Sequence, residues 1–288
     1  MPVPRISFEF FPPQSLQASF QLWETALALA QMQPTFVSVT CGAGGTRPTL
    51  THEAVSTLRA TTGLPVAAHL TCVAASRTEV LAMAEAYAAA GVTEIVALRG
   101  DAPADGQRFA PHPAGFANTV ELVEALVKTG QFNIRVGAYP EPHPDAADAG
   151  ADVTWLKRKI DAGATSAITQ FFFEADTFFR FRDACVNAGI TVPIIPGILP
   201  ITSWDGAKRF ARRCGAAVPQ RLDAAFATAT RDGRAELLAL AHCTALCDRL
   251  ILGGAEDLHF YTLNRLHLTR EVVRTLGFTS DIVLEKVA

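Results

Sequence analysis

The chain alternates between short, apolar, β-rich runs and longer stretches with helical periodicity from one end to the other. The β-rich runs are almost continuously apolar, which is typical of parallel strands buried on both faces. Glycine follows several helical stretches, as in AAAGVTEI and VNAGITVP, where the end of a helix needs a positive φ. We expect strands over residues 5–11, 35–41, 65–72, 94–101, 133–139, 166–173, 192–199 and 257–263.

The stretches between these runs predict a helix after each strand, with an additional helical segment, about 233–252, before the eighth strand. Eight βα units in 288 residues predict an α/β fold, a (β/α)8 TIM barrel, as a single domain over 1–288. A doubly wound sheet is the alternative, but the Gly-rich CGAGGT (41–46) lacks G-x-G-x-x-G spacing and follows the second strand. The other expected helices are 15–31, 51–62, 76–90, 116–128, 145–162, 175–188, 203–213 and 267–276.

Composition narrows the class of protein. Hydrophobic residues make up 49% of the chain and the net charge is −3, without a basic run that would suit nucleic acid or an anionic membrane. No apolar stretch is long enough to span a bilayer, and the N-terminus lacks the layout of a signal peptide. The six cysteines form no C-x-x-C pair, so we expect free thiols in the cytoplasm and no metal site. Cys243 and Cys247 lie four apart, and a metal or disulfide there is the alternative to two small core residues.

Polar side chains gather at the expected carboxyl ends of the strands, whereas most strand middles are apolar. In a (β/α)8 barrel these ends form the active site, so the pattern predicts a polar pocket above an apolar core. The residues at these ends are Glu9, Thr40, His69, Thr71, Arg99, Gly100, Asp101, Tyr139, Gln170, Tyr261, Asn264 and Arg265.

Several of these residues also have a purely structural interpretation. His69 could be a hydrogen-bonded core histidine, Tyr139 could cover the top of the barrel, and Arg99 with Asp101 could form an ion pair that closes a loop. Gln170 is harder to explain in this way, because both ends of a buried amide need partners.

Glu9 is the least ordinary of them, since it lies in the aromatic run ISFEFFPP (6–13). Strand geometry places Ser7, Glu9 and Phe11 on one face, opposite Phe8 and Phe10. A carboxyl group at the mouth of an aromatic-walled pocket would have a raised pKa. We therefore expect Glu9 to act as a general acid near neutral pH.

Longer motifs resemble one enzyme family over essentially the whole chain. SFEFFPP (7–13), HLTC (69–72), VALRGD (96–101) and LKRKIDAGATSAITQFFF (156–173), with FVSVTCGAGG, AYPEPHP, IIPGILPI and FYTLNR, are similar to methylenetetrahydrofolate reductases of the bacterial, single-domain type. The resemblance implies a barrel that holds non-covalent FAD. NAD(P)H would reduce the flavin and leave, and 5,10-methylenetetrahydrofolate would then take its place and become 5-methyltetrahydrofolate, the methyl donor for methionine synthesis.

The resemblance also implies residue roles. Glu9 would protonate N10 of the folate, and Asp101 would anchor the pterin and tune the flavin. Gln170 would bind folate and nicotinamide in turn, and Phe210 would face either substrate, although a core position in the seventh helix is its alternative. Thr40, Tyr261 and Arg265 complete the expected substrate contacts. The FAD contacts would be Thr40, Cys41, Ala43, His69, Arg99, Gly100, Asp101, Tyr139, His143, Ala146, Asp152, Trp155, Arg158 and Lys159.

Three positions depart from the family pattern. Cys41 replaces a tyrosine, Trp155 an asparagine near the adenosine half of FAD, and Gly206 a glutamine near the substrate. Without the regulatory domain of eukaryotic members, inhibition by S-adenosylmethionine is not expected. We expect a homo-oligomer, while the preference for NADH or NADPH stays open. The alternatives are a metal-dependent lyase or aldolase that uses Glu9, Asp101 and His69, and a pterin- or flavin-binding protein without turnover.

Overall fold

The structure, a computed structural model, describes residues 4–41, 48–100, 110–146, 148 and 150–278. Asp101 and Ala43, two of the expected site residues, lie outside the described residues. Its strands are β1 (Arg5–Phe10), β2 (Phe36–Val39), β3 (Val66–Thr71), β4 (Glu94–Leu98), β5 (Asn133–Ala138), β6 (Ser166–Thr169), β7 (Ile194–Ile195), β8 (Gly197–Ile198) and β9 (Asp257–Tyr261).

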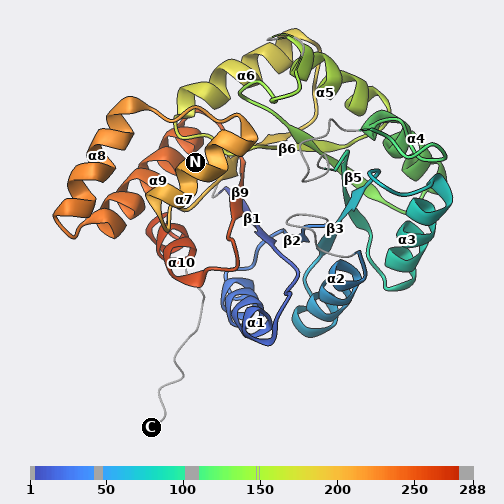
Figure 1. The fold of residues 1–288 in the computed structure, drawn as a ribbon, viewed down its shortest axis with the longest axis horizontal. Coiled ribbons are helices and arrows are strands. Elements are labelled where there is room, and N and C mark those ends of the chain that lie inside the picture. Colours follow the sequence, from blue (N-terminus) through green and yellow to red (C-terminus); the bar gives the residue numbers. More distant parts are fainter. Residues whose placement is uncertain (1–3, 42–47, 101–109, 147, 149, 279–288) are drawn as a thin grey trace.

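The helices lie outside the strands and surround them (Figure 1). Capping side chains mark several helix starts: Ser76 and Glu79 form a capping box, and Asn118 and Ser203 accept backbone N–H groups of the first turn. The helices are α1 (Leu16–Ala30), α2 (Pro48–Thr62), α3 (Arg77–Ala89), α4 (Thr119–Thr129), α5 (Ala151–Asp161), α6 (Ala175–Asn187), α7 (Trp204–Cys214), α8 (Gln220–Arg231), α9 (Ala235–Leu252) and α10 (Leu266–Thr275).

The sheet is a nearly closed parallel barrel, which confirms the predicted TIM-barrel fold. Its strand order is β7-β6-β5-β4-β3-β2-β1-β9-β8, with every pairing parallel. The seventh expected strand is divided at Pro196: β7 pairs with β6, and β8 pairs with β9. Proline has no N–H to donate, but its carbonyl accepts from the His259 N–H at 3.0 Å. The sheet therefore closes through residues 194–198.

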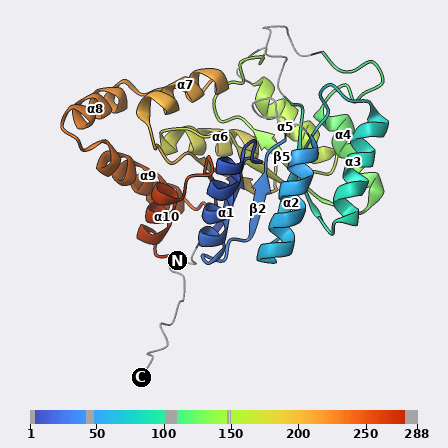
Figure 2. The ribbon, with the colours of Figure 1, turned by 60° about the horizontal axis from the view of Figure 1, so that its bottom comes forward.

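The region between β8 and β9 differs from the prediction, because it contains three helices rather than the two expected. Helix α9 matches the expected segment 233–252, but α8 was not predicted. Only Leu222 and Phe226 of α8 are buried, which leaves little apolar periodicity to detect. Phe226 stacks on Trp204 of α7 with centroids 4.5 Å apart. Figure 2 shows α7 and α8 above α9 and α10.

Several expected boundaries were also wrong. The fourth strand ends at Leu98 rather than 101, and the sixth ends at Thr169 rather than 173. Phe171, Phe172 and Phe173 leave the sheet and are buried in the outer core, which explains why they looked like a strand. The fifth helix begins at Ala151 rather than 145. The described helices include none with the length and apolar character that crossing a membrane requires.

Alternation along the strands divides the apolar residues into two layers. Phe8 and Phe10 belong to the large cluster between the sheet and the helices, as period-2 geometry predicts. A small cluster fills the barrel itself: Phe36, Ala67, Val96, Ile168 and Ile195.

The barrel interior also holds polar and charged side chains in some strand middles, in addition to the predicted apolar core. Ser38 and His259 are fully buried. The Arg135 guanidinium pairs with Glu94 at 3.0 Å and lies over the Phe36 ring at 4.1 Å. Charges buried in this way are tolerated when they are paired. The Arg135–Glu94 pair therefore fills one end of the barrel interior.

The closure at Gly197 can be tested by adding one methyl group. A Cβ at Gly197 would lie 2.2 Å from the Thr169 carbonyl oxygen and 2.6 Å from the Tyr261 ring, so β6 and β9 must separate in Gly197→Ala. We expect a loss of about 2–3 kcal/mol in the free energy of unfolding, measured by urea titration. Gly206→Ala is the control, because its nearest contacts lie at 3.5 Å and helix propensity favours alanine. Equal stability of Gly197→Ala and the parent would contradict a tight closure.

Candidate active site

Glu9 lies inside the barrel near the carboxyl end of β1. Its backbone is level with Ser38 on β2 and Tyr261 on β9. The carboxylate approaches His69 Nε2 at 3.3 Å and His259 Nε2 at 3.7 Å, with only 12% of its side chain exposed. Neither approach has the alignment of a hydrogen bond, since both Nε2 atoms are buried without a hydrogen-bond partner. These contacts bring together residues from β1, β3 and β9.

His259 is oriented by its second ring nitrogen. The Ser7 hydroxyl lies 2.8 Å from Nδ1, which leaves Nε2 directed toward Glu9. The imidazole also stacks on Phe36, with centroids 5.6 Å apart and planes at 15°. Burial lowers the pKa of His259 despite the neighbouring carboxylate. The arrangement Ser7–His259–Glu9 is therefore a line of polar groups with one end held in the barrel core.

The electrostatics of Glu9 differ from the prediction. Burial is the largest influence and would raise its pKa, but the charge of His69 and the contacts with His259 outweigh it and set the pKa to about 2. Phe8 and Phe10 point away into the outer core, as strand alternation predicts, and two histidines face the carboxylate. Glu9 is therefore ionised at neutral pH in this structure.

Gln170 and Tyr261 lie near the same end of the barrel, but each already has one bond. The Gln170 side-chain carbonyl accepts from the Phe171 N–H at 3.0 Å. The Tyr261 hydroxyl donates to the Thr169 carbonyl at 2.6 Å. The phenol thus helps to close the sheet, and it presents a ring rather than a free hydroxyl to a ligand.

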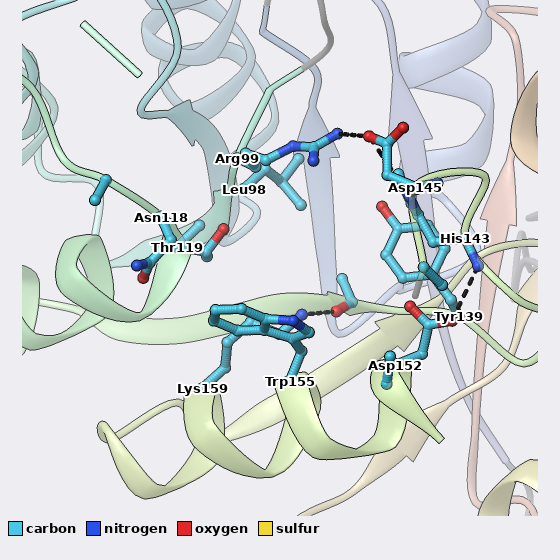
Figure 3. A pocket seen from close by; sticks show the side chains of 15 residues that line it. Leu98, Arg99, Asn118, Thr119, Tyr139, His143, Asp145, Asp152, Trp155 and Lys159 are labelled. Atoms are coloured by element: carbon cyan, nitrogen blue, oxygen red, sulfur yellow. Dashed lines mark hydrogen bonds and ion pairs between the residues drawn. The ribbon is translucent and has the colours of Figure 1, made fainter. Parts of the chain in front are cut away.

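A first pocket of about 410 Å³ gathers many of the residues expected to contact the cofactor. Figure 3 shows Trp155 and Lys159 projecting from α5, with Arg99, Tyr139 and His143 arriving from the neighbouring strands and loops. The residues expected at the cofactor that line this pocket are Arg99, Tyr139, His143, Ala146, Asp152, Trp155 and Lys159.

An ion pair, a hydrogen bond and a ring contact shape this pocket. Arg99 pairs with Asp145 at 2.8 Å. The expected ion pair of Arg99 with Asp101 stays a prediction, because Asp101 lies outside the described residues. The Asp152 carboxylate accepts from the His143 N–H at 2.9 Å, and His143 meets Tyr139 edge to face at 4.7 Å. Asp152 therefore holds the loop that carries His143.

Lys159 places a partly buried cation at this pocket. Its ammonium group donates to the Gly137 carbonyl, and burial lowers its pKa to about 8. Isolated buried charges are costly, and they are usually retained where a charged partner binds. Lys159 therefore marks the pocket as a site for an anion.

Thr40 and Gly100 lie between this pocket and Glu9 along the strand ends. The Thr40 hydroxyl is buried without a hydrogen-bond partner among the described residues, although its backbone groups bond to Phe10 and Thr51. Gly100 has φ +91°, and a Cβ there would lie 2.4 Å from Val73. Cys41 is half-buried, and burial raises the pKa of its thiol. The buried Thr40 hydroxyl is the kind of group to which a ligand could supply the missing hydrogen bond.

Arg158 lies apart from the other expected cofactor contacts. Its side chain is exposed, and its guanidinium lies 5.0 Å from the Trp155 ring centroid, outside the pocket lining.

A second pocket of about 470 Å³ lies beside α7. Phe11, Phe210 and Arg265 line it, together with Arg209 and Arg213. Phe210 is half-buried, and its ring packs 5.0 Å from Phe171, so it is both a core contact and a pocket wall. The Arg265 guanidinium donates to the Thr202 hydroxyl at 3.2 Å.

Sequence reasoning missed His259, Arg209 and Arg213. The run DLHFY places His259 two residues before Tyr261, so period-2 alternation could have put both in the barrel. Arg209 and Arg213 lie one helical turn apart and could have been grouped with Phe210.

Comparisons by sequence show one family, and a comparison by structure shows a shared fold. The model described as methylenetetrahydrofolate reductase matches residues 3–277. A 5,10-methylenetetrahydrofolate reductase of Salmonella typhimurium is 42% identical over 273 residues, covering 94% of this chain and 90% of that one. One from Pectobacterium carotovorum is 41% identical over 278 residues, with 96% and 91% covered. An uncharacterized Clostridium thermocellum protein, described as binding two copies of 5-methyl-5,6,7,8-tetrahydrofolic acid, shares the fold with a TM-score of 0.61, 11% identity and 96% of each chain covered.

The pKa of Lys159 predicts an unusual pH dependence of stability. Below about 8 the lysine is charged in the folded and the unfolded chain, and the folded state carries the full cost of burying it. As the pH rises from about 8 toward the ordinary value of 10.5, this cost disappears. Lys159→Met should therefore stabilise the ligand-free protein at pH 7. We expect a net gain of about 1–3 kcal/mol, because the loss of one hydrogen bond offsets part of the benefit.

The gain should fade as the pH approaches 10.5, which thermal melts at several pH values can measure. Lys157→Met is the control, because Lys157 pairs with Asp161 at the surface of the same helix. A Lys159→Met protein less stable than the parent at pH 7 would show that the buried ammonium stabilises the fold.

Proposed function

The chain belongs to the methylenetetrahydrofolate reductase family and reduces 5,10-methylenetetrahydrofolate to 5-methyltetrahydrofolate, and we propose that NAD(P)H supplies the hydride through non-covalently bound FAD. The carrying observation is the family match over residues 3–277, together with Glu9 at the barrel mouth. The protein is thus an oxidoreductase of folate one-carbon metabolism, and we propose that its product supplies methyl groups for methionine synthesis.

The first pocket suits FAD. Lys159 and Arg99 offer cations for a diphosphate, and Trp155 offers an aromatic face for an adenine. The unpartnered Thr40 hydroxyl and the close backbone approach at Gly100 suit the flavin ring. FAD would supply the redox chemistry, accepting hydride from the nicotinamide and passing it to the folate. Trp155 would replace the hydrogen bond of the asparagine found in relatives with stacking.

Gln170 would bind the two substrates in turn. Its carbonyl accepts from Phe171, which leaves its NH₂ group to donate to a pterin or to a carboxamide. One binding position for both substrates requires the nucleotide to leave before the folate enters. This order supports ping-pong kinetics.

Glu9 would deliver a proton to N10 of the folate, which opens the five-membered ring. The free carboxylate is ionised, with a pKa of about 2, so it must first take up a proton. Two features of the site favour proton uptake by Glu9. A bound folate would remove the last water from a side chain that is only 12% exposed, which raises a carboxyl pKa. His69 Nε2 lies 3.3 Å from the carboxylate, within reach for proton transfer once the substrate is bound.

The other expected site residues, the location and the assembly of the protein are also proposals. Phe210 and Arg265 line the second pocket and would face the folate beyond its pterin. Asp101 lies outside the described residues, and its role as a pterin anchor stays a prediction. The six free thiols support the reducing cytoplasm as the location. Assembly into a homo-oligomer also stays a prediction.

Two alternatives remain as contrasts. The metal-dependent lyase would use Glu9 and His69 as ligands, but family membership favours hydride transfer. A folate- or flavin-binding protein without turnover would have no use for a carboxylate between two histidines, because binding alone does not require an acid.

The function is tested by separating the two half-reactions. Purified protein reconstituted with FAD should be yellow. Under anaerobic conditions NAD(P)H should bleach the flavin absorbance at ~450 nm. 5,10-Methylenetetrahydrofolate should then restore the absorbance, followed by stopped flow, with 5-methyltetrahydrofolate as product. Protein that binds no FAD, or reduced protein that the folate does not reoxidise, would contradict the proposal.

Glu9→Gln should separate the same two steps. The amide cannot supply the proton, so the folate half-reaction should slow by at least ~100-fold, while flavin reduction by NAD(P)H stays within about threefold of the parent. Glu94→Gln is the control for loss of a barrel carboxylate, because Glu94 pairs with Arg135 away from the mouth. If Glu9→Gln slows both halves equally, Glu9 is a structural residue.

A further inference from the structure

Helix α1 has two apolar sides, and the barrel uses only one of them. Leu22 and Leu29 on the inner side are fully buried in the core between the sheet and the helices. On the outer side Leu16 is 75% exposed, Phe20 67% and Leu27 45%. We call this outer row the α1 stripe, and its members are Leu16, Phe20, the partly buried Trp23 and Leu27.

The spacing of the α1 stripe is that of a seam between two packed helices. Its members follow one another at intervals of four, three and four residues. These intervals are those of the a and d positions of a heptad repeat. With about 3.6 residues per turn, they keep all four side chains on one narrow face of the helix. A surface helix whose outer face meets only water carries polar residues there, so the stripe indicates a second packing contact.

No described element covers the α1 stripe. Figures 1 and 2 show α1 on the outside of the ring, between α2 and α10, with no other described helix or strand beyond it. The stripe exposes on the order of 400 Å² of apolar surface, a size that marks interaction sites on single protein chains. The other large apolar side chains that are exposed in the described part of the chain lie singly on α4, α5 and α6 or at opposite ends of α9.

The α1 stripe has the same spacing when it is read from either end. Leu16 and Leu27 lie at its two ends, and Phe20 and Trp23 lie in its middle. In two antiparallel α1 helices related by a twofold axis, Leu16 would meet Leu27 of the partner subunit, and Phe20 would meet Trp23 of the partner subunit. A twofold axis requires a self-complementary surface of this kind. The antiparallel arrangement also brings opposite ends of the two helix dipoles together.

The polar residues beside the α1 stripe fit the same arrangement. Gln17 and Glu24 lie two helical turns apart on one flank of the stripe. Antiparallel pairing places Gln17 opposite Glu24 of the partner subunit, where its amide NH₂ group can donate to the carboxylate. Glu24 is the only charged residue of α1, so repulsion between the two copies is small.

We propose that two copies of this chain pair through the α1 stripe, antiparallel and about a twofold axis, to form a homodimer. Two stripes would together remove on the order of 800 Å² of apolar surface from water, and the flanking residues add polar area. This area is at the small end of specific interfaces, so we expect the dimer to dissociate at micromolar concentration. The described lining of neither pocket includes a residue of α1, so pairing leaves the candidate active site open.

The first test replaces one exposed apolar residue on each of two helices. Phe20→Glu puts a charge in the middle of the stripe, whereas Val186→Glu puts the same charge at a residue that is 64% exposed on α6. The full-length protein is followed by sedimentation velocity from ~1 to ~100 µM, a range that brackets a micromolar dissociation constant. The parent and Val186→Glu should associate as the concentration rises. Phe20→Glu should weaken this association by at least ~100-fold, with an unchanged circular dichroism spectrum, because each copy would bury an unpaired carboxylate.

The second test checks the direction of pairing at one flanking position. Gln17→Lys would attract Glu24 of the partner subunit and should tighten the dimer, whereas Gln17→Glu would repel it and should weaken the dimer. Each contact occurs twice about the twofold axis, so each change should be about two- to tenfold and should shrink at high salt. Gln17 lies in the first turn of α1, where an acidic residue stabilises a helix, so a weaker Gln17→Glu dimer would not reflect unfolding.

A parent that stays monomeric at ~100 µM would overturn the inference, as would an association that Phe20→Glu leaves unchanged or that Val186→Glu weakens equally. A shift in the same direction for both Gln17 variants would contradict the antiparallel arrangement. A monomeric parent that dimerises once residues 279–288 are deleted would assign the α1 stripe to that segment of the same chain. None of these results depends on flavin or folate, so failure of the inference is distinct from failure of the proposed function.

Discussion

The close approach of the chain at Gly197 to β6 and β9 is the constraint on which the rest of the barrel depends. The Gly197 N–H bonds to the Thr169 hydroxyl at 2.9 Å, and the Tyr261 hydroxyl bonds to the Thr169 carbonyl at 2.6 Å. Only glycine fits here, because a Cβ would overlap both neighbours. Without this closure β9 would lose its β8 neighbour, and the position of His259 relative to Glu9 would no longer be held.

A barrel closed in this way buries charge at two levels. Arg135 and Glu94 form an ion pair toward one end, while Glu9 meets His69 and His259 toward the other. Desolvating a charge costs several kcal/mol unless it is paired, so each level contains its own partners. Arg135 and Glu94 neutralise each other within the protein. The carboxylate at the mouth is held less completely, since neither histidine is aligned to hydrogen-bond with it, and it remains available to a substrate.

The two pockets divide the ligand chemistry around this carboxylate. The first pocket offers Lys159 and Arg99 with Trp155, which suits a phosphate-bearing cofactor. The second pocket, beside α7, offers arginines and aromatic rings. Glu9 lies near the carboxyl ends of the strands that lead to both. The fold thus places the acid at the end of the barrel that both pockets adjoin.

The sequence by itself determined the alternation of strands and helices, and with it the barrel and the end of the barrel where the site lies. It also determined which side of β1 carries Glu9, because alternation is a local property. The extra helix α8 escaped prediction, since only Leu222 and Phe226 are buried. The ionisation of Glu9 was predicted with the wrong sign. A pKa depends on the charges that the fold brings within a few ångströms, and His259 is 250 residues away along the chain. Only the closed tertiary structure places that imidazole beside the carboxylate.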